Sequence, residues 1–314
     1  MAMQLTRNRR VALALLAVGA LALAACGDDG DEGAGSDTGS TLPPVTEPSS
    51  DTTPPDDTTP PNGDVAYERP TGADEVIVEY SEVGGFTTRE FAFQRTPNLL
   101  VSGGNEVFRP GAQIAIFPAP LLPAVQVQEI TDEGIQNLLA AADAAGLFAD
   151  IEYEDPTNIA DATTARVVIN VDGESWVHEA YALGLSGPGG AGGESTPERQ
   201  ALAGFVAGLG DLATVVGPDN LAGDAELYEA DEFAIEALPV DDLDAYGGDE
   251  AEPTVVPWPA DAGASLTVAT TCTVVPAEGV ADTFADANQL TFFDDGGAVY
   301  QVLVRPVLPG GGCD

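Results

Sequence analysis

The sequence contains no lysine, one histidine and only three cysteines. The absence of lysine excludes a P-loop nucleotide site, a pyridoxal Schiff base and a Ser-x-x-Lys nucleophile, because each of these needs a lysine amine. One histidine and the two cysteines beyond Cys26 cannot assemble a zinc cluster of histidine and cysteine ligands. We therefore predict no cofactor and no catalytic residue of these classes.

Basic residues are scarce as a whole. The ten residues counted as Lys+Arg are all arginine, and they stand against 52 acidic residues, which gives a formal net charge of −42. A chain this acidic repels phosphate backbones and anionic lipid surfaces, so nucleic acid is excluded as a partner. The large excess of acidic residues has two alternative explanations. One is solubility, and the other is adaptation to high salt, where mobile cations screen the repulsion between the acidic residues.

The acidic residues also raise the question of cation binding. Asp242, Asp244 and Gly247 match the first, third and sixth positions of an EF-hand loop, whereas Tyr246 and Pro253 occupy the fifth and twelfth. A bidentate glutamate belongs at the twelfth position, so the motif is incomplete. A looser acidic cation site stays open as an alternative.

The first part of the chain has the pattern of an export signal. Arg7, Arg9 and Arg10 are followed by an uncharged apolar run over Val11–Ala22, and the chain becomes polar soon afterwards. A basic start, an apolar run of about a dozen residues and small residues before the cut are typical of a secretory signal peptide. The run is shorter than the roughly 20 residues that span a bilayer, so we predict a signal peptide over residues 1–25.

The end of this signal, Leu23-Ala24-Ala25-Cys26, resembles the lipobox of bacterial lipoproteins. The resemblance implies that Cys26 is acylated on its sulfur and becomes the mature N-terminus. It places the protein on the outer face of the bacterial cell membrane, with the membrane as its partner through the lipid. The alternative is a plain secretory signal with an unrelated cysteine.

A polar stretch over residues 26–64 follows, and it repeats Thr and Pro between Thr41 and Pro61. A segment with so little to bury cannot offset the entropy of ordering, so we predict a disordered linker. The linker holds the folded part clear of the membrane.

The remaining chain is predicted to be α+β. In residues 65–217, short alternating runs at 75–80, 91–93, 99–101 and 125–130 predict antiparallel strands, with a further short apolar run at 114–117. Two packed helices are predicted, one opened by Thr131 and ended by Gly146, the other capped by Thr196 with Pro197 in first position.

Residues 164–181 give the clearest prediction, a β-hairpin. Asp172-Gly173 stands between two β-rich runs and indicates a two-residue type I′ turn. This turn places Ile169 opposite Trp176, Val167 opposite His178, and Arg166 opposite Glu179. The last pair is attractive across the strands, so the register and the chemistry agree.

Residues 218–314 are predicted to form a smaller, acidic, strand-rich C-terminal part. Cys272 and Cys313 lie in it, and we predict that they form a disulfide, because an exported protein meets an oxidising environment and these two remain after Cys26 is lipidated. Two buried thiols and intermolecular pairing are the alternatives.

Several short sequence segments together resemble those of a group of secreted actinobacterial lipoproteins with no assigned function. They are Gln113–Pro118, Thr131–Gly146, Tyr181–Gly184, Val256–Pro259 and Arg305–Pro309 with Cys313 close behind. The resemblance covers most of the chain after the linker and implies an extracytoplasmic, lipid-tethered protein with paired cysteines. It carries over no catalytic residue, and the glycines at 310–312 depart from the more charged ending of the group.

Two kinds of catalytic site are conceivable beside ordinary structural roles for the same residues. His178 is expected to be a half-buried sheet residue. As a catalytic base it would need a serine nucleophile nearby, and the candidates are Ser175 and Ser186. The segment Gly184–Pro188 around Ser186 resembles Gly-x-Ser-x-Gly but has proline in place of the final glycine. Paired carboxylates could hydrolyse glycosides, although 52 acids bring many pairs together by chance. We therefore predict an envelope lipoprotein of unknown role, a non-catalytic binding or structural module displayed outside the membrane, with no specified protein or glycan partner. The alternative is a carboxylate-dependent cell-surface hydrolase.

Overall fold

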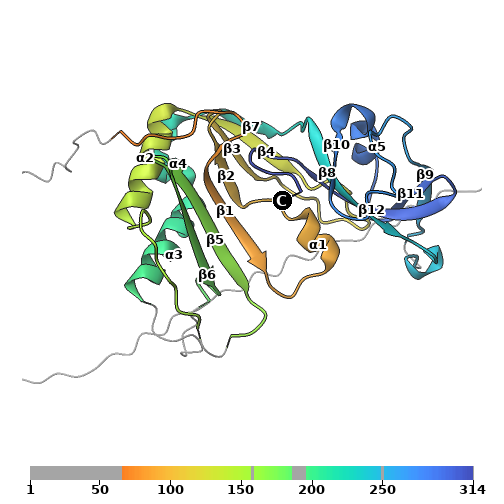
Figure 1. Ribbon diagram of the computed structural model, residues 1–314, viewed down its shortest axis with the longest axis horizontal. Coiled ribbons are helices and arrows are strands. Elements are labelled where there is room, and N and C mark those ends of the chain that lie inside the picture. Colours follow the sequence, from red (N-terminus) through yellow and green to blue (C-terminus); the bar gives the residue numbers. More distant parts are fainter. Residues whose placement is uncertain (1–65, 157–158, 186–195, 249–250, 314) are drawn as a thin grey trace, which may run out of the picture. The chain divides into compact units, whose positions relative to one another are not determined.

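The computed structural model describes residues 66–156, 159–185, 196–248 and 251–313. The predicted signal peptide, the linker and Cys26 lie outside these residues. The described chain forms two sheets, one of seven strands in the order β6-β5-β1-β2-β3-β4-β7 and one of five in the order β10-β8-β12-β11-β9 (Figure 1). The mixed α+β class, with more strand than helix, is confirmed.

The seven-stranded sheet is antiparallel throughout. Its strands are β1 Val76–Gly84, β2 Leu99–Ser102, β3 Glu106–Pro110, β4 Val125–Ile130, β5 Thr163–Val171, β6 Glu174–Tyr181 and β7 Leu221–Leu227. Strand β7 lies beyond residue 217, where the first part was predicted to end. The chain changes sheets after β7, between Leu227 and Glu232.

The β5–β6 hairpin has the predicted register, with Ile169 opposite Trp176, Val167 opposite His178 and Arg166 opposite Glu179. Its two turn residues, Asp172 and Gly173, have φ values of 53° and 76°. Positive φ at both central residues is the requirement of a type I′ turn, which glycine meets freely and aspartate tolerates.

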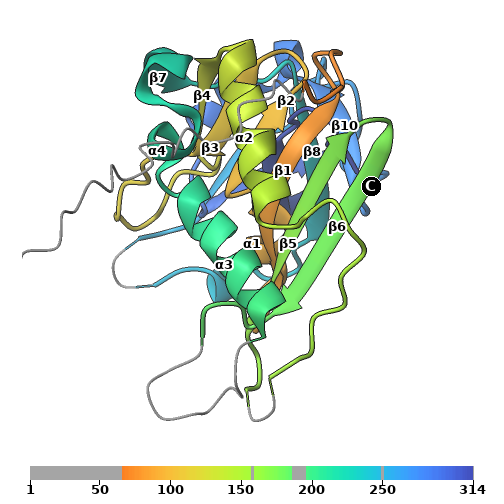
Figure 2. The same ribbon diagram turned by 90° about the vertical axis from the view of Figure 1, so that its left-hand side faces the viewer.

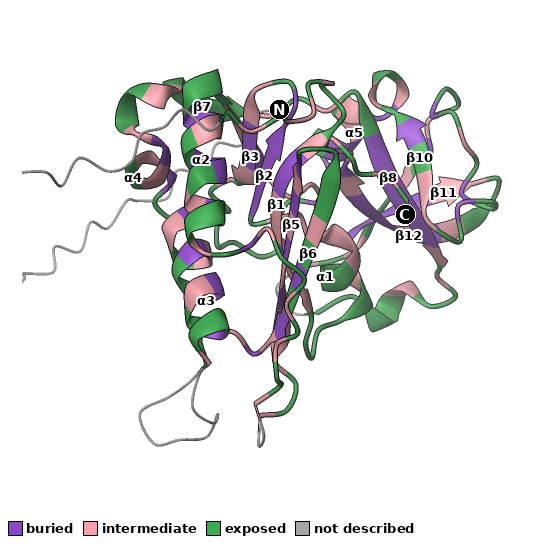
Figure 3. Cartoon of the chain, turned by 60° about the vertical axis from the view of Figure 1, so that its left-hand side comes forward, coloured by how far each residue is buried: buried purple, intermediate pink, exposed green. Residues whose placement is uncertain are grey.

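Helices α2 (Asp132–Ala144) and α3 (Pro197–Leu209) lie along one face of this sheet (Figure 2). The Thr131 hydroxyl accepts a hydrogen bond from the Gly134 amide at 3.1 Å, and the Thr196 hydroxyl accepts one from the Arg199 amide at 3.3 Å. Both predicted caps are therefore present. The buried stripes of the helices face the sheet, and their exposed sides face solvent (Figure 3).

The five-stranded sheet is mixed rather than antiparallel, because β9 runs parallel to β11. Its strands are β8 Glu232–Pro239, β9 Thr254–Pro257, β10 Thr273–Pro276, β11 Thr291–Asp295 and β12 Ala298–Pro306. Helix α5 (Ala281–Ala285) closes its core, where the Phe284 ring meets those of Phe233, Trp258 and Phe293. The remaining short helices are α1 Arg89–Gln94, α4 Leu212–Val216, η1 Pro218–Asn220, η2 Leu243–Ala245 and η3 Ala277–Gly279.

Two predicted strands of the first part are wrong. Phe91 and Phe93 lie in α1, where the Thr88 hydroxyl accepts a hydrogen bond from the Phe91 amide and starts a helical turn. The apolar run at 114–117 is part of an exposed loop between β3 and β4. Pro118 and Pro120 have no amide hydrogen to donate, which disfavours strand pairing in this segment.

Candidate functional site

The two faces of the seven-stranded sheet differ in chemistry. On β5, Val167 and Ile169 point to the face covered by α2 and α3, which we call the inner face, and both are fully buried there. The side chains between them point to the opposite, outer face. The centre of the outer face is largely polar and consists of Glu79, Ser81, Arg166, Val168 and Asn170.

The C-terminal tail, residues 307–313 after β12, lies against the outer face (Figure 1). Leu308 packs in a small apolar cluster with Leu100, Phe108 and Val125. Gly310 has φ +67°, and a Cβ atom there would lie 2.5 Å from Cγ2 of Val76 on β1. Glycine therefore allows the tail to approach the strand this closely.

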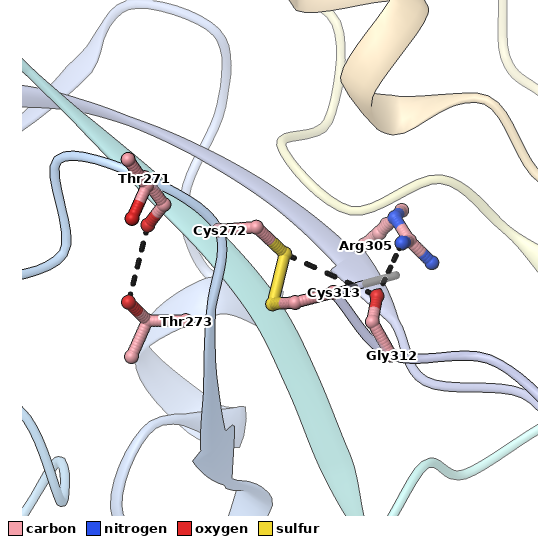
Figure 4. Close-up of a disulfide and its surroundings, with 6 residues drawn as sticks. All are labelled: Thr271, Cys272, Thr273, Arg305, Gly312 and Cys313. Atoms are coloured by element: carbon pink, nitrogen blue, oxygen red, sulfur yellow. Dashed lines mark hydrogen bonds between the residues drawn. A yellow bond between two sulfur atoms is a disulfide. The ribbon is translucent and has the colours of Figure 1, made fainter.

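The tail is held by the predicted disulfide, which the structure confirms. Cys272 and Cys313 are bonded, with their Cα atoms 5.3 Å apart. Beside the disulfide, Nη2 of Arg305 donates to the carbonyl oxygen of Gly312 at 2.5 Å (Figure 4). The end of the tail is thus joined to Cys272, just before β10, by a covalent bond, and to Arg305 near the end of β12 by a charged hydrogen bond.

A groove of about 1400 Å³ lies between the outer face, α1 and the tail. Its floor is formed by side chains of β1 and β5, and one wall by residues 305–313, including the disulfide. Ligand pockets commonly occupy roughly 300–1,000 Å³, so the groove has room for a ligand of substantial size. We identify this groove as the candidate functional site.

Charge of both signs lines the groove. Four of the seven described arginines do so, namely Arg69, Arg95, Arg166 and Arg305. The acidic residues that line it are Glu68, Asp74, Glu75, Glu79, Glu82, Asp172 and Glu174. The groove therefore has a far higher proportion of cations than the chain as a whole.

The cations at one end are held by main-chain and aromatic groups. Nη1 of Arg95 donates to the carbonyl oxygens of Glu82 and Gly84, at the end of β1. The guanidinium carbon of Arg305 lies 5.8 Å from the ring centroid of Phe93 in α1. Burial lowers the pKa of Arg305, but an arginine begins so high that it stays charged.

Arg166 belongs to the same end, because it lies opposite Ser81 on β1. Its Nε forms an ion pair of 3.2 Å with Glu179 on β6. Among the described residues, neither Arg95 nor Arg305 has a carboxylate within 4.0 Å. We call Arg95, Arg166 and Arg305 the basic end of the groove.

Five of the seven acidic residues that line the groove lie at the other end, beside the start of β1 and the β5–β6 turn, whereas Glu79 and Glu82 lie farther along β1. The amide of Asp172 donates to the carbonyl oxygen of Glu68 at 2.7 Å, and the amide of Glu68 donates to Oδ1 of Asp172 at 2.8 Å. Asp74 and Glu75 directly precede β1, and Glu174 follows the turn. We call these five residues the acidic end; Arg69, which also lies there, is neutralised by Asp132 at 2.5 Å.

His178 has a structural environment and is more deeply buried than predicted. It is fully buried on the inner face, with Nε2 2.9 Å from the carbonyl oxygen of Leu147 and Nδ1 3.0 Å from the hydroxyl of Tyr153. Burial, followed by Glu198, raises the pKa of Tyr153 to about 12, while Arg199 acts in the opposite direction. Both ring nitrogens of His178 are therefore engaged within the core.

The predicted serine partners do not join His178 in the described structure. Ser175 is exposed on β6, and its position alternates with those of Trp176 and His178, so it points to the outer face. Ser186 lies outside the described residues. The EF-hand-like residues Asp242 and Asp244 are exposed, and the Asp244 amide donates to Oδ1 of Asp242 at 3.1 Å.

No group of three or more His, Cys, Asp or Glu side chains within the described ranges could hold a metal ion. Within the same ranges, no helix is long and apolar enough to cross a membrane. Comparison with known proteins gives no match to a family model, a curated protein or a solved structure. The groove must therefore be interpreted from its own chemistry.

Proposed function

We propose that this chain is a lipid-anchored, extracytoplasmic, non-catalytic binding module that takes its ligand in the outer-face groove. The observation that carries the proposal is the groove itself, with its polar floor and its wall stapled by Cys272 and Cys313. A disulfide persists outside the reducing cytoplasm, which agrees with the export signal. The lipobox-like residues 23–26 supply the anchor.

The carboxylates of the groove support binding rather than glycoside hydrolysis. The hydroxyl of Ser81 donates to Oε1 of Glu79 at 2.6 Å, so the central carboxylate is occupied by a neighbour on its own strand. Glu106, whose pKa is raised by burial and by Glu129, would suit a general acid but does not line the groove. Glycoside hydrolysis requires a pair of carboxylates with separate acid and nucleophile roles.

The binding function is tested by blocking the groove in the mature full chain. Val168 is half-buried on the groove floor, and Val177 lies opposite it on β6, on the same face but outside the groove lining. We expect Val168→Trp to abolish retention of the protein on cell-wall fragments from the expressing host. Val177→Trp is the matched control and should bind like the wild type.

Equal retention of Val168→Trp and wild type, or no retention of either, would contradict the binding function. Shortening of the glycan strands during incubation would instead favour the carboxylate-dependent hydrolase. Thermal melting of both variants establishes that they are folded.

The anchor is tested separately with a clickable fatty acid in living cells. The label should enter the wild type and the Cys272→Ser control but not Cys26→Ser, which should be released into the medium or remain unprocessed. Stable anchoring requires more than one acyl chain. Labelling of Cys26→Ser would contradict lipidation at this residue.

A further inference from the structure

We propose that the ligand of the groove is an extended peptide with a free carboxylate and a free ammonium group, bound with its carboxylate at the basic end. This inference rests on the proposed binding function and specifies its ligand. It starts from the separation of opposite charges along β1.

The pairing of the strands fixes that separation. Asn170 on β5 donates to the carbonyl oxygen of Val76 at 2.8 Å, which places the following β5–β6 turn beside the start of β1. Arg166, four residues earlier on β5, lies opposite Ser81. The acidic and basic ends are therefore about five strand residues apart, or roughly 17 Å.

The charges at these ends do not neutralise each other. Within the described chain, the ion pairs are Arg69–Asp132, Arg89–Glu236 and Arg166–Glu179. None of them joins an acid of the groove to an arginine of the basic end. Arg166 is already paired with Glu179, so Arg95 and Arg305 are the arginines of the basic end without a carboxylate partner among the described residues. The groove thus presents separated charges of both signs, and a ligand with matching separated charges would complement them.

The basic end has hydrogen-bond donors suited to a carboxylate. A guanidinium carries five N–H donors in a planar fork, and the bonds of Arg95 to Glu82 and Gly84 both come from Nη1. The bond of Arg305 to Gly312 comes from Nη2. A half-buried cation without a carboxylate is unfavourable, so a bound carboxylate would stabilise this arrangement.

The distance between the two charged ends of the groove favours a peptide over a single free amino acid as the zwitterionic ligand. A free amino acid cannot span roughly 17 Å, whereas an extended peptide of about five or six residues can, at 3.3–3.6 Å per residue. The floor also offers short polar and apolar side chains, such as Ser81 and Val168, which can accept a neutral peptide backbone. A multiply charged phosphate ligand fits less well, because seven acids line the same groove.

The test uses a pool of hexapeptides built only from Gly, Ala, Ser and Gln, so that the two termini carry the only charges. The pool is prepared with free termini, N-acetylated, C-amidated or blocked at both ends, and retention by the mature full chain is measured by ultrafiltration and mass spectrometry. Each block should reduce retention by roughly tenfold or more, since a charge-assisted hydrogen bond contributes about that factor.

Variants assign each terminus to its end of the groove. Arg95→Gln should remove most of the effect of amidation, and Arg95→Lys should restore part of it. The double variant Asp74→Asn with Glu174→Gln should reduce the effect of acetylation alone. If Arg95→Gln does not melt cooperatively, Arg166→Gln tests the same end.

The outcomes separate the ligand class from the binding function. Equal retention of free and blocked pools, or no retention of any pool while cell-wall fragments still bind in a Val168→Trp-sensitive way, overturns the peptide and leaves the binding module standing. Loss of both kinds of binding overturns both proposals. Swapped effects of the two sets of variants overturn the proposed orientation.

Discussion

The inner and outer faces of the seven-stranded sheet are built from the same strands but are covered in different ways. On the inner face, α2 and α3 bury a continuous apolar layer that includes Val167 and Ile169. On the outer face, a short tail covers only part of a largely polar surface and is fastened by Cys272–Cys313. Helices α2 and α3 are held on the inner face by apolar packing, whereas the tail is held on the outer face by a disulfide at its end.

With the proposed function, this difference lets one sheet combine stability with binding. Successive strand residues point to opposite faces, so a side chain that stabilises the core and one that faces a ligand can be neighbours in sequence. Burial of apolar area stabilises the inner face. The outer face keeps its polar and charged groups available, and the disulfide compensates for the small apolar contact of the tail.

The largest effect is expected from breaking the staple. Cys313→Ser should lower the free energy of unfolding by up to about 4 kcal/mol, because the cysteines are 41 residues apart and the bond restricts the unfolded chain. It should also release the wall of the groove, so amide hydrogen exchange should increase in residues 307–312 before it changes in α2. Urea unfolding and native-state exchange measure the two effects, and unchanged exchange in the tail would contradict this role.

A smaller loss is expected from removing the buried polar group of the inner face. His178→Leu should lower the free energy of unfolding by about 3 kcal/mol, because it leaves the Leu147 carbonyl and the Tyr153 hydroxyl without this partner. Ser175→Ala on the outer face should change it by less than about 0.5 kcal/mol. Similar denaturation midpoints for the two variants would mean that His178 is dispensable to the core.

The two faces can be compared directly with one substitution at adjacent positions. Val167→Ala should cost about 2 kcal/mol, because two buried carbon groups are lost from a packed core. Val168→Ala should cost less than about 1 kcal/mol, since Val168 lies on the half-open groove floor. Equal costs, measured by urea unfolding, would show that the outer face is packed like the inner one.

The smallest effect concerns pH and a like-charge pair on the outer face. Burial, followed by repulsion from Glu129 directly opposite, raises the pKa of Glu106 above the ordinary value of 4.5. The folded state then binds the Glu106 proton more tightly than the unfolded state does. The free energy of unfolding therefore falls as pH rises above the pKa that Glu106 has in the unfolded chain.

Glu106→Gln should therefore stabilise the protein at about pH 7, by less than about 1 kcal/mol, and make little difference at about pH 4. Glu174→Gln, at an exposed position, is the matched control for loss of one acid. Thermal melting across this pH range measures both. A larger increase in melting temperature from Glu106→Gln at about pH 4 than at about pH 7 would contradict this prediction.

The parts of the fold that depend on local chemistry could be predicted from the sequence. Asp172-Gly173 determines its own turn and thereby the register of β5 and β6, and Thr131 caps the helix that follows it. Phe91 and Phe93 misled the prediction, because a spacing of two residues also occurs within one helical turn. The capping of the Phe91 amide by Thr88 decided the outcome.

The groove could not be predicted because its walls come from distant parts of the chain. Val76 begins β1, whereas Gly310 belongs to the tail, and only the folded topology brings them together. The scarcity of arginine was a usable clue, since four of the seven described arginines line the groove. The disulfide was predictable from the number of cysteines and the predicted export signal, but its position beside a groove was not.

The most direct test of the account is to map where a ligand contacts the folded chain. Amide chemical shifts of the mature protein should be recorded with and without the free-termini hexapeptide pool. The account predicts changes confined to the groove, that is residues 68–75, β1, β5, the β5–β6 turn, the start of β6, α1 and the tail, with Val168 and Gly312 among the residues affected and α2 and α3 unaffected. Changes centred on the inner-face helices, or the same pattern of changes in Val168→Trp, would contradict the division of the sheet into a stabilising face and a binding face.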